Sequence, residues 1–312
     1  EMRKNRTFIL DALKKNGLAL EYAFRGNVKF VITAVTQNGL ALRLAVKSLR
    51  NCQVVVLQAV KQNASAFMFA SEKMRGCQEI VLEAVRQKPD LLKFASFPMR
   101  EDPVVVMAAV QQDGCAYEHS VGTVRNDPQI FLESFKRWSS RSKDTIKYAS
   151  SELCRNRDIV LISAKQYGCT LSHADSRFRS DREVVLAAVQ NNGLAMRFVS
   201  RGLRRDREVV LAAVQQSGWA LEYVEEKFRS DREIAFIAVK KTFDAICLVS
   251  QDLRLDRELV LAAVMANGRA LQFVPEELQG DREIVLAAIQ KTREALKFAS
   301  AKLREELEKE GY

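Results

Sequence analysis

The sequence is built from a motif that returns every 25 residues. The stretch DREVVLAAV begins at Asp181 and again at Asp206, and close variants begin at Asp231, Asp256 and Asp281. The same register runs backwards through Asn156, Asp127, Asp102, Cys77, Cys52, Asn27 and Asn5. Such a period is typical of repeat proteins, in which each unit buries its apolar face against its neighbours. The sequence therefore predicts twelve repeats, and not the two globular domains that a length of 312 residues would suggest.

Each repeat predicts a helix, a turn and a second, shorter helix. Position 1 of the motif is Asp or Asn in ten of the twelve repeats, and both residue types cap helix N-termini. An apolar run follows, with Ala at position 8 and a turn such as Asn192-Gly193. We expect glycine there to adopt the left-handed conformation of a helix C-terminus. Helix-forming residues dominate without strict alternation, so the Asn-Gly pairs do not predict β-hairpins. Positions 3, 7, 10 and 11 are expected to stay exposed.

The composition agrees with a helical fold. Only 13 Gly and 5 Pro occur, few for a chain with many tight turns. A hydrophobic fraction of 47% excludes global disorder, and no apolar run approaches the roughly 18 residues of a membrane helix. The predicted fold class is all-α, an α-solenoid or superhelical array of about twelve 25-residue helix–turn–helix repeats.

The predicted solenoid is a single domain, residues 1–312, with four regions. These are basic N-terminal repeats (1–126), an irregular repeat with a four-residue insertion (127–155), regular repeats (156–304) and a charged C-terminal cap or tail (305–312).

The sequence motif of the repeat resembles that of a known family, the "domain of unknown function 4116". The resemblance is strong over residues 181–305, looser over 5–155, and covers nearly the whole chain. It implies a helical repeat protein. It implies no functional residue, because the family has no established activity.

The positive charge is concentrated in the first half of the chain. The net charge is +10, and residues 1–155 hold 24 basic and 15 acidic residues. A basic end can attract nucleic acid, anionic lipid or an acidic protein. A solvated basic surface is the simpler interpretation, because no block of five Lys or Arg occurs.

Position 24 carries an arginine in ten repeats, which we call the arginine ladder: Arg25, Arg50, Arg75, Arg100, Arg125, Arg179, Arg204, Arg229, Arg254 and Arg304. One interpretation is a track for a polyanion. It would use Arg25, Arg43, Lys47, Arg50, Arg75, Arg100 and Arg125. The favoured interpretation is structural, in which each arginine bridges to the next repeat or to helix-end carbonyls.

The sixth repeat carries the candidate partner-binding residues Lys136, Arg137, Trp138 and Arg141, the last within the insertion 139–142. Trp219, at the variable position 14, is a further candidate, since Trp and Arg are favoured interface anchors. Insertions in repeat arrays map to loops, often on the binding face. A tolerated loop, with Trp138 covering a packing irregularity, is an equally good interpretation.

No residue set predicts a catalytic, metal or cofactor site. His119 and His173 occupy position 18, where other repeats have aromatic residues, so semi-buried histidines are expected. A catalytic set of Cys169, His173 and Asp175 lacks any supporting motif. The six cysteines form no CxxC pair. Variation at positions 14 and 17 is better explained as surface drift than as a base-reading code.

The sequence therefore predicts a non-catalytic scaffold that binds a protein partner or larger assembly over an extended surface. The alternative is binding of RNA or another polyanion through the basic repeats. We expect no cofactor, no small-molecule substrate and no transmembrane segment. An intracellular, reducing compartment is expected from the cysteines. The chain begins at Glu1, so we also expect a missing or processed N-terminus.

Overall fold

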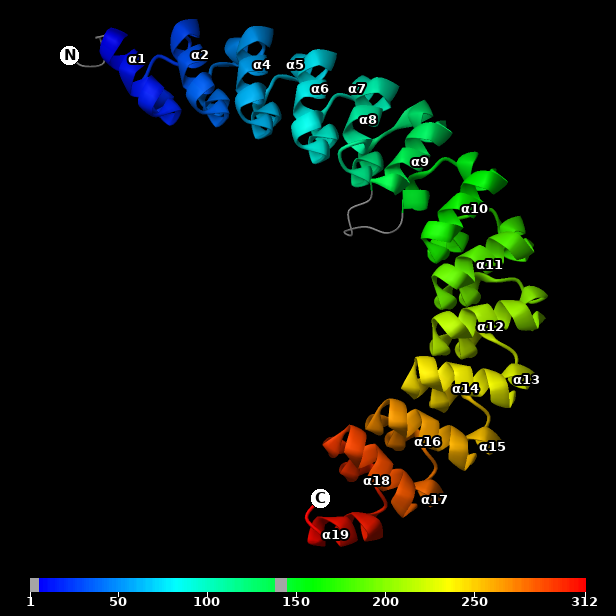
Figure 1. Cartoon of the computed structure of the whole chain (residues 1–312). Helices are drawn as coiled ribbons and strands as arrows, with labels where there is room; N and C mark the ends of the chain where they lie inside the picture. Colours follow the sequence, from blue (N-terminus) through cyan, green and yellow to red (C-terminus); the bar gives the residue numbers. More distant parts are fainter. Residues whose placement is uncertain (1–5, 138–144) are drawn as a thin grey trace. The chain divides into compact units, whose positions relative to one another are not determined.

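The computed structural model describes residues 6–137 and 145–312, and every regular element within them is helical (Figure 1). The chain divides into two compact units, residues 1–153 and 154–312, called here the N-terminal and C-terminal units. The expected all-α class is confirmed. That the whole chain forms one continuous domain with the four regions given above stays a prediction.

Each repeat begins with a long α-helix. In the N-terminal unit these are α1 (Arg6–Lys15), α2 (Val28–Gln37), α4 (Gln53–Gln62), α6 (Gln78–Gln87), α8 (Pro103–Val110) and α9 (Pro128–Lys136). In the C-terminal unit they are α10 (Arg157–Gln166), α11 (Arg182–Asn191), α12 (Arg207–Gln216), α14 (Arg232–Lys241), α16 (Arg257–Ala266) and α18 (Arg282–Lys291).

The second helix of each repeat is a 3₁₀ helix. The N-terminal unit has η2 (Gly17–Tyr22), η3 (Gly39–Leu44), η4 (Ala64–Phe69), η5 (Pro89–Phe94), η6 (Gly114–His119) and η8 (Thr145–Tyr148). The C-terminal unit has η10 (Gly168–Ser172), η12 (Gly193–Phe198), η14 (Gly218–Tyr223), η15 (Phe243–Leu248), η16 (Gly268–Phe273) and η17 (Arg293–Phe298). With three residues per turn, positions 13 and 16 fall on one face, and both Gly39 and Leu42 are buried.

A third, very short helix closes most repeats. The α-helical ones are α3 (Lys47–Arg50), α5 (Glu72–Arg75), α7 (Phe97–Glu101), α13 (Glu226–Arg229), α15 (Gln251–Arg254), α17 (Glu276–Gln279) and the longer α19 (Ala301–Lys309). The 3₁₀ ones are η7 (Gly122–Asn126), η9 (Leu153–Arg155), η11 (Ser176–Ser180) and η13 (Leu203–Arg205). The repeat therefore has three helical segments, where the sequence predicted two and a closing stretch.

Within each unit the helices pack in two rows. Each long helix contacts the long helix of the next repeat, and each 3₁₀ helix contacts the next 3₁₀ helix, as the side-by-side ribbons of Figure 1 show. The core lies between the rows. In the eighth repeat Val184, Val185, Ala188, Ala195 and Met196 are fully buried, and the equivalent positions are buried along both units. Each repeat therefore completes its core with its neighbours.

The predicted N-caps are confirmed. Asp206 accepts hydrogen bonds from the backbone N–H groups of Glu208 and Val209, and the Asp and Asn residues that begin the other described long helices cap them in the same way. Cys52 and Cys77 make no side-chain cap. A second cap, not expected from the sequence, precedes the 3₁₀ helix: the Asn38 side chain accepts from the N–H of Leu40 at 3.0 Å.

The expectation for the turn glycines was wrong. Among the described residues only Gly122 and Gly311 have positive φ, so Gly17 and Gly39 do not relieve a left-handed conformation. The reason for glycine is close approach between repeats. A Cβ on Gly39 would overlap the backbone oxygen of Ala59, one repeat further on. Glycine lets the 3₁₀ helix lie against the next long helix.

The exposed strip of the long helix differs slightly from the prediction. In α11, Glu183 and Gln190, at positions 3 and 10, are exposed as expected, whereas Ala187 at position 7 is buried. Position 2, occupied by Arg182, is exposed as well. This unpredicted exposure allows position 2 to contact the neighbouring repeat, as described below.

Candidate binding surface

The variable positions 14 and 17 share one edge with position 18, which is usually aromatic. We call the residues at positions 14, 17 and 18, the second, fifth and sixth of each 3₁₀ helix, the 3₁₀ edge. Every described side chain at these positions is exposed or half-buried. Positions 13, 15 and 16 between them are buried in most repeats, so the backbone holds the edge residues at a regular spacing. The fold thus keeps a constant framework beneath a variable surface.

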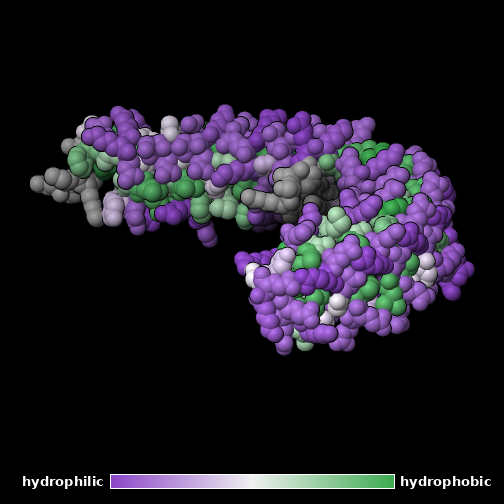
Figure 2. Space-filling view, turned by 60° about the horizontal axis from the view of Figure 1, so that its bottom comes forward, coloured by the Kyte–Doolittle hydropathy of each residue, from purple (hydrophilic) through white to green (hydrophobic). Residues whose placement is uncertain are grey.

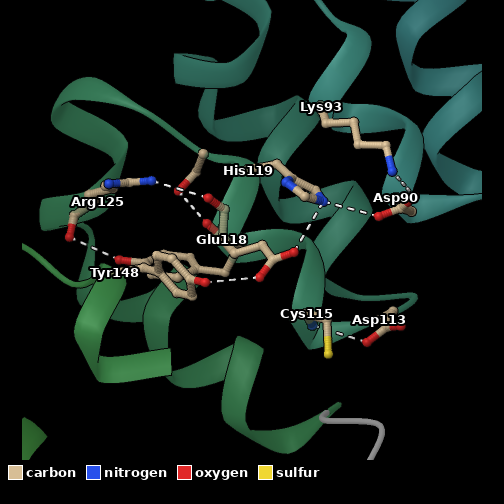
Figure 3. Close-up of polar contacts among 10 residues, drawn as sticks. Asp90, Lys93, Asp113, Cys115, Glu118, His119, Arg125 and Tyr148 are labelled. Atoms are coloured by element: carbon tan, nitrogen blue, oxygen red, sulfur yellow. Dashed lines mark hydrogen bonds and ion pairs between the residues drawn. The ribbon is translucent and has the colours of Figure 1, made fainter. Parts of the chain in front are cut away.

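Polar side chains on the 3₁₀ edge of the fourth, fifth and sixth repeats contact one another (Figure 3). The His119 Nε2 lies 3.1 Å from Asp90 Oδ1 and 3.5 Å from Glu118 Oε1. Tyr148 donates its hydroxyl to Glu118 Oε2 at 3.1 Å. A hydrogen bond from Lys93, together with His119, lowers the pKa of Asp90 below its usual range. Asp90 therefore presents an ionised, exposed carboxylate next to a half-buried histidine.

Cations recur beside the aromatic residues of the edge. A cation at position 17 lies over the aromatic ring at position 18 in four repeats, 4.4 to 5.3 Å from the ring centroid: Lys93–Phe94, Lys147–Tyr148, Arg197–Phe198 and Lys297–Phe298. Such contacts hold a long flexible side chain against an apolar face. The edge therefore offers aromatic residues and an arginine, which are residue types enriched at protein interfaces.

The arginine ladder makes local contacts. Arg204 donates to the backbone oxygens of Arg197 and Val199, and Arg229 donates to those of Leu221, Glu222 and Val224. In the N-terminal unit, Arg25 donates to the oxygen of Glu21 and Arg125 to that of Glu118. These acceptors are the free carbonyls at the end of the 3₁₀ helix. The contacts support the structural interpretation of the ladder.

Gln279 makes the same contacts without a charge. It stands at position 24 of the eleventh repeat and donates to the backbone oxygens of Leu271 and Val274 at 3.2 and 2.9 Å. A ladder side chain therefore needs a donor of the right length more than it needs a positive charge.

The remaining residues that were predicted to bind a polyanion make no such hydrogen bonds to backbone carbonyls of the described residues. Arg43 and Lys47 are exposed, and Arg50, Arg75 and Arg100 are half-buried, each with a buried Nε that has no hydrogen-bond partner. Lys47, Arg50 and Arg75 line one pocket between the second and third repeats. The structure thus brings these three together, whereas Arg125 turns to a carbonyl.

The predicted partner-binding residues are spread over both units. Lys136 and Arg137 share one carboxylate, with Lys136 Nζ 2.9 Å and Arg137 Nε 3.8 Å from Glu133. Trp138 and Arg141 lie outside the described residues. Trp219 lies in the C-terminal unit, on the 3₁₀ edge, with 36% of its surface exposed.

Two members of the catalytic set that was weighed from the sequence, Cys169 and Asp175, have contacts outside that set. The Cys169 sulfur accepts from Asn192 at 3.2 Å, and Asp175 lies 3.5 Å from the Nε of Arg155. Among residues 6–137 and 145–312, no group of three or more His, Cys, Asp or Glu is placed to hold a metal ion.

Sequence reasoning missed an ion network in the C-terminal unit. Arg157, at position 2, donates to Asp181 at 2.6 Å and to Glu183 at 2.7 Å, which are positions 1 and 3 of the next repeat. Equivalent pairs follow from Arg182, Arg207, Arg232 and Arg257. The guanidinium hydrogen bond lowers the pKa of Asp181, Asp206 and Asp256. The sequence sign of this ion network was the tripeptide Asp-Arg-Glu, which recurs every 25 residues.

From the second to the sixth repeat, the N-terminal unit has neutral residues at position 2. Gln53 donates to Glu79 at 2.8 Å and Gln78 to Asp102 at 2.9 Å.

Figure 2 shows hydrophilic residues over most of one face of the molecule, with smaller hydrophobic patches between them. Within the described part of the chain, no helix combines the length and apolar character needed to cross a membrane.

A family model described as a domain of unknown function (DUF4116) matches the chain six times, at residues 27–75, 77–120, 127–179, 156–204, 206–254 and 256–304. Each match covers about two repeats. No curated protein and no solved structure matches the chain.

Proposed function

Because this chain belongs to the DUF4116 family of helical repeats, whose function is unknown, we propose its role from geometry: a non-catalytic scaffold that binds a protein partner along the 3₁₀ edge. The observation that carries the proposal is the contrast between buried positions that repeat and edge positions 14 and 17, which vary. In repeat proteins such a surface allows partner specificity to change without disturbing the fold.

The chemistry of the edge supports a protein partner. Trp219 and Arg269 both occupy position 14, two repeats apart, and Arg197 lies over the ring of Phe198. Aromatic residues and arginine are the residue types enriched at protein interfaces. The ladder contacts weigh against a continuous polyanion track, because Arg125, Arg204 and Arg229 are already hydrogen-bonded to carbonyls.

A pair of matched variants tests the proposal. The edge variant carries Arg197→Ser, Trp219→Ser and Arg269→Ser. The control carries Gln215→Ser, Lys240→Ser and Lys291→Ser, which removes the same number of cations from exposed positions of the long helices.

Affinity capture from native lysate with quantitative mass spectrometry should recover a defined partner with the wild type and the control, and much less with the edge variant. Hydrogen exchange on the purified complex should then show protection of η12, η14 and η16. Equal loss in both variants, or protection only of the long helices, would contradict the proposal.

A further inference from the structure

The pocket between the second and third repeats brings together three cations. It measures about 520 Å³, and its lining includes Lys47, Arg50 and Arg75, with Glu72 as the one carboxylate. α3 supplies Lys47 and Arg50, and α5 supplies Glu72 and Arg75. The backbone N–H of Ser71 donates to the Arg50 oxygen at 2.9 Å, and the Ser71 hydroxyl donates to Asn51 Oδ1 at 2.7 Å. The two helices are thus fixed to each other beneath the cations.

These cations have no partner within the described chain. The side chains of Lys47, Arg50 and Arg75 make no hydrogen bond, ion pair or ring contact there, and the buried Nε atoms of both arginines are unpaired. An unpaired buried donor costs free energy until an acceptor reaches it. Arg100, Arg125, Arg179 and Arg254 also have a buried, unpaired Nε. What marks this place is the pocket that Lys47, Arg50 and Arg75 line together.

The equivalent place in the C-terminal unit is neutralised. Arg201, Arg204 and Arg229 occupy the same repeat positions as Lys47, Arg50 and Arg75. There, Arg204 and Arg229 bond to carbonyls, and Glu225 stands where the pocket has Ser71. Glu225 pairs with Arg205 at 2.5 Å, and that hydrogen bond lowers the pKa of Glu225. The same fold thus carries a compensated and an uncompensated version of one site.

We infer that the pocket of Lys47, Arg50 and Arg75 binds carboxylates of an acidic segment in a protein partner. Guanidinium groups bind carboxylates through paired, charge-assisted hydrogen bonds. A nucleic acid backbone needs a longer run of cations. Here the run is interrupted, because Asp90, Glu101 and Asp102 follow in the next two repeats. The inference rests on the proposed function and adds the chemistry of the partner.

Glutamine variants remove the charge while keeping a ladder donor, since Gln279 shows that glutamine makes the ladder contacts. The site variant is Lys47→Gln with Arg50→Gln and Arg75→Gln. The matched control is Arg201→Gln with Arg204→Gln and Arg229→Gln. Lys47→Gln alone changes only an exposed side chain and guards against a folding defect in the triple variant.

The probe is a fluorescein-labelled peptide of three glutamates flanked by glycine and serine. Its binding to the full chain is measured by fluorescence anisotropy. We expect salt-sensitive binding that the site variant weakens about tenfold or more, Lys47→Gln about threefold, and the control less than about twofold. The second probe is a single-stranded RNA with the same label.

Absence of peptide binding, or equal weakening by both triple variants, would overturn the inference. RNA that binds more tightly than the peptide and loses its affinity in the site variant would overturn it in favour of a phosphate ligand. A failure with the peptide leaves the proposed scaffold role to be decided by the 3₁₀-edge variants, which alter none of these cations.

Discussion

The Nε of Arg182 donates to Asp206 Oδ2 at 3.0 Å, while Asp206 Oδ1 caps the long helix α12 of the next repeat. One carboxylate therefore starts a helix and joins it to the repeat before. This arrangement recurs through the C-terminal unit, and in the third and fourth repeats of the N-terminal unit glutamine contacts take its place.

The first prediction concerns this arginine. Arg182→Gln should lower the Tm by about 1–3 °C at low salt, because it removes the charge from one exposed network. At roughly 1 M NaCl the difference from the wild type should nearly vanish, since salt screens exposed charges. Thermal unfolding followed by circular dichroism measures both values. A difference that is independent of salt would show that the arginine acts through packing instead.

The converse substitution should stabilise the N-terminal unit. Gln78→Arg would face Asp102, which already accepts a hydrogen bond from Gln78 and caps α8. A charge-assisted bond is stronger than the neutral one it replaces. Hydrogen exchange of peptides from α6 and α8 should slow in this variant. Unchanged exchange would indicate that the geometry of the ion network does not transfer between the units.

The third prediction is a loss of stability in acid. The pKa values of Asp181, Asp206 and Asp256 are lowered by their arginine hydrogen bonds. A carboxyl with a lowered folded pKa stabilises the fold above its unfolded pKa of about 3.9, and that stabilisation is lost as the pH falls through the folded value. The Tm should drop more steeply between about pH 5 and pH 2 for the wild type than for the variant with Arg157→Gln, Arg182→Gln and Arg232→Gln. Parallel curves would contradict the linkage.

The fourth prediction separates charge from hydrogen bonding in the arginine ladder. Arg229→Ala should cost about 1–2 kcal/mol of unfolding free energy, since three backbone oxygens lose their donor. Arg229→Gln should cost much less, because Gln279 makes such contacts in another repeat. Urea denaturation measures both. Equal costs would mean that the charge itself is required.

The fifth prediction concerns the turn glycines. Gly39→Ala should destabilise the chain by about 1–3 kcal/mol, because the new Cβ overlaps the Ala59 oxygen and must push two repeats apart. Gly202→Ala is the control, since no atom lies within 4 Å of the added Cβ. That control should be neutral or slightly stabilising. Urea denaturation of both variants measures the two changes in unfolding free energy.

The sequence predicted what depends on a single repeat. Asp206 as a cap, the buried Ala188 and the helical class follow from local preference and period, and all are found. Contacts between repeats were missed. Gly39 is needed for close packing against Ala59, twenty residues away, and not for a positive φ, which the local sequence could not show. The partners of Arg157 likewise lie 24 and 26 residues ahead of it. Predicting contacts between repeats requires the displacement from one repeat to the next, which a local sequence pattern does not give.

The candidate surface was predicted only in part. The sequence singled out Trp219 and seven polyanion candidates, and the structure brings three of the seven, Lys47, Arg50 and Arg75, together in one pocket. The bonding of Arg204 to carbonyls and the linkage of Asp90, His119 and Tyr148 through Glu118 required coordinates. A ladder of identical residues does not reveal from sequence which members are already paired.

The backbone hydrogen bond that joins closing segments at most junctions also has a mechanical meaning. The N–H of Ser71 donates to the Arg50 oxygen, that of Ser96 to Arg75, and that of Ser200 to Arg179. Within a unit pulled from its ends, every junction carries the load in series, so the weakest opens first. Junctions without a guanidinium–carboxylate pair, such as that between α2 and α4, should yield before those of the C-terminal unit. Under tension the chain would lengthen in steps of one repeat, and it would re-form its junctions in turn when released.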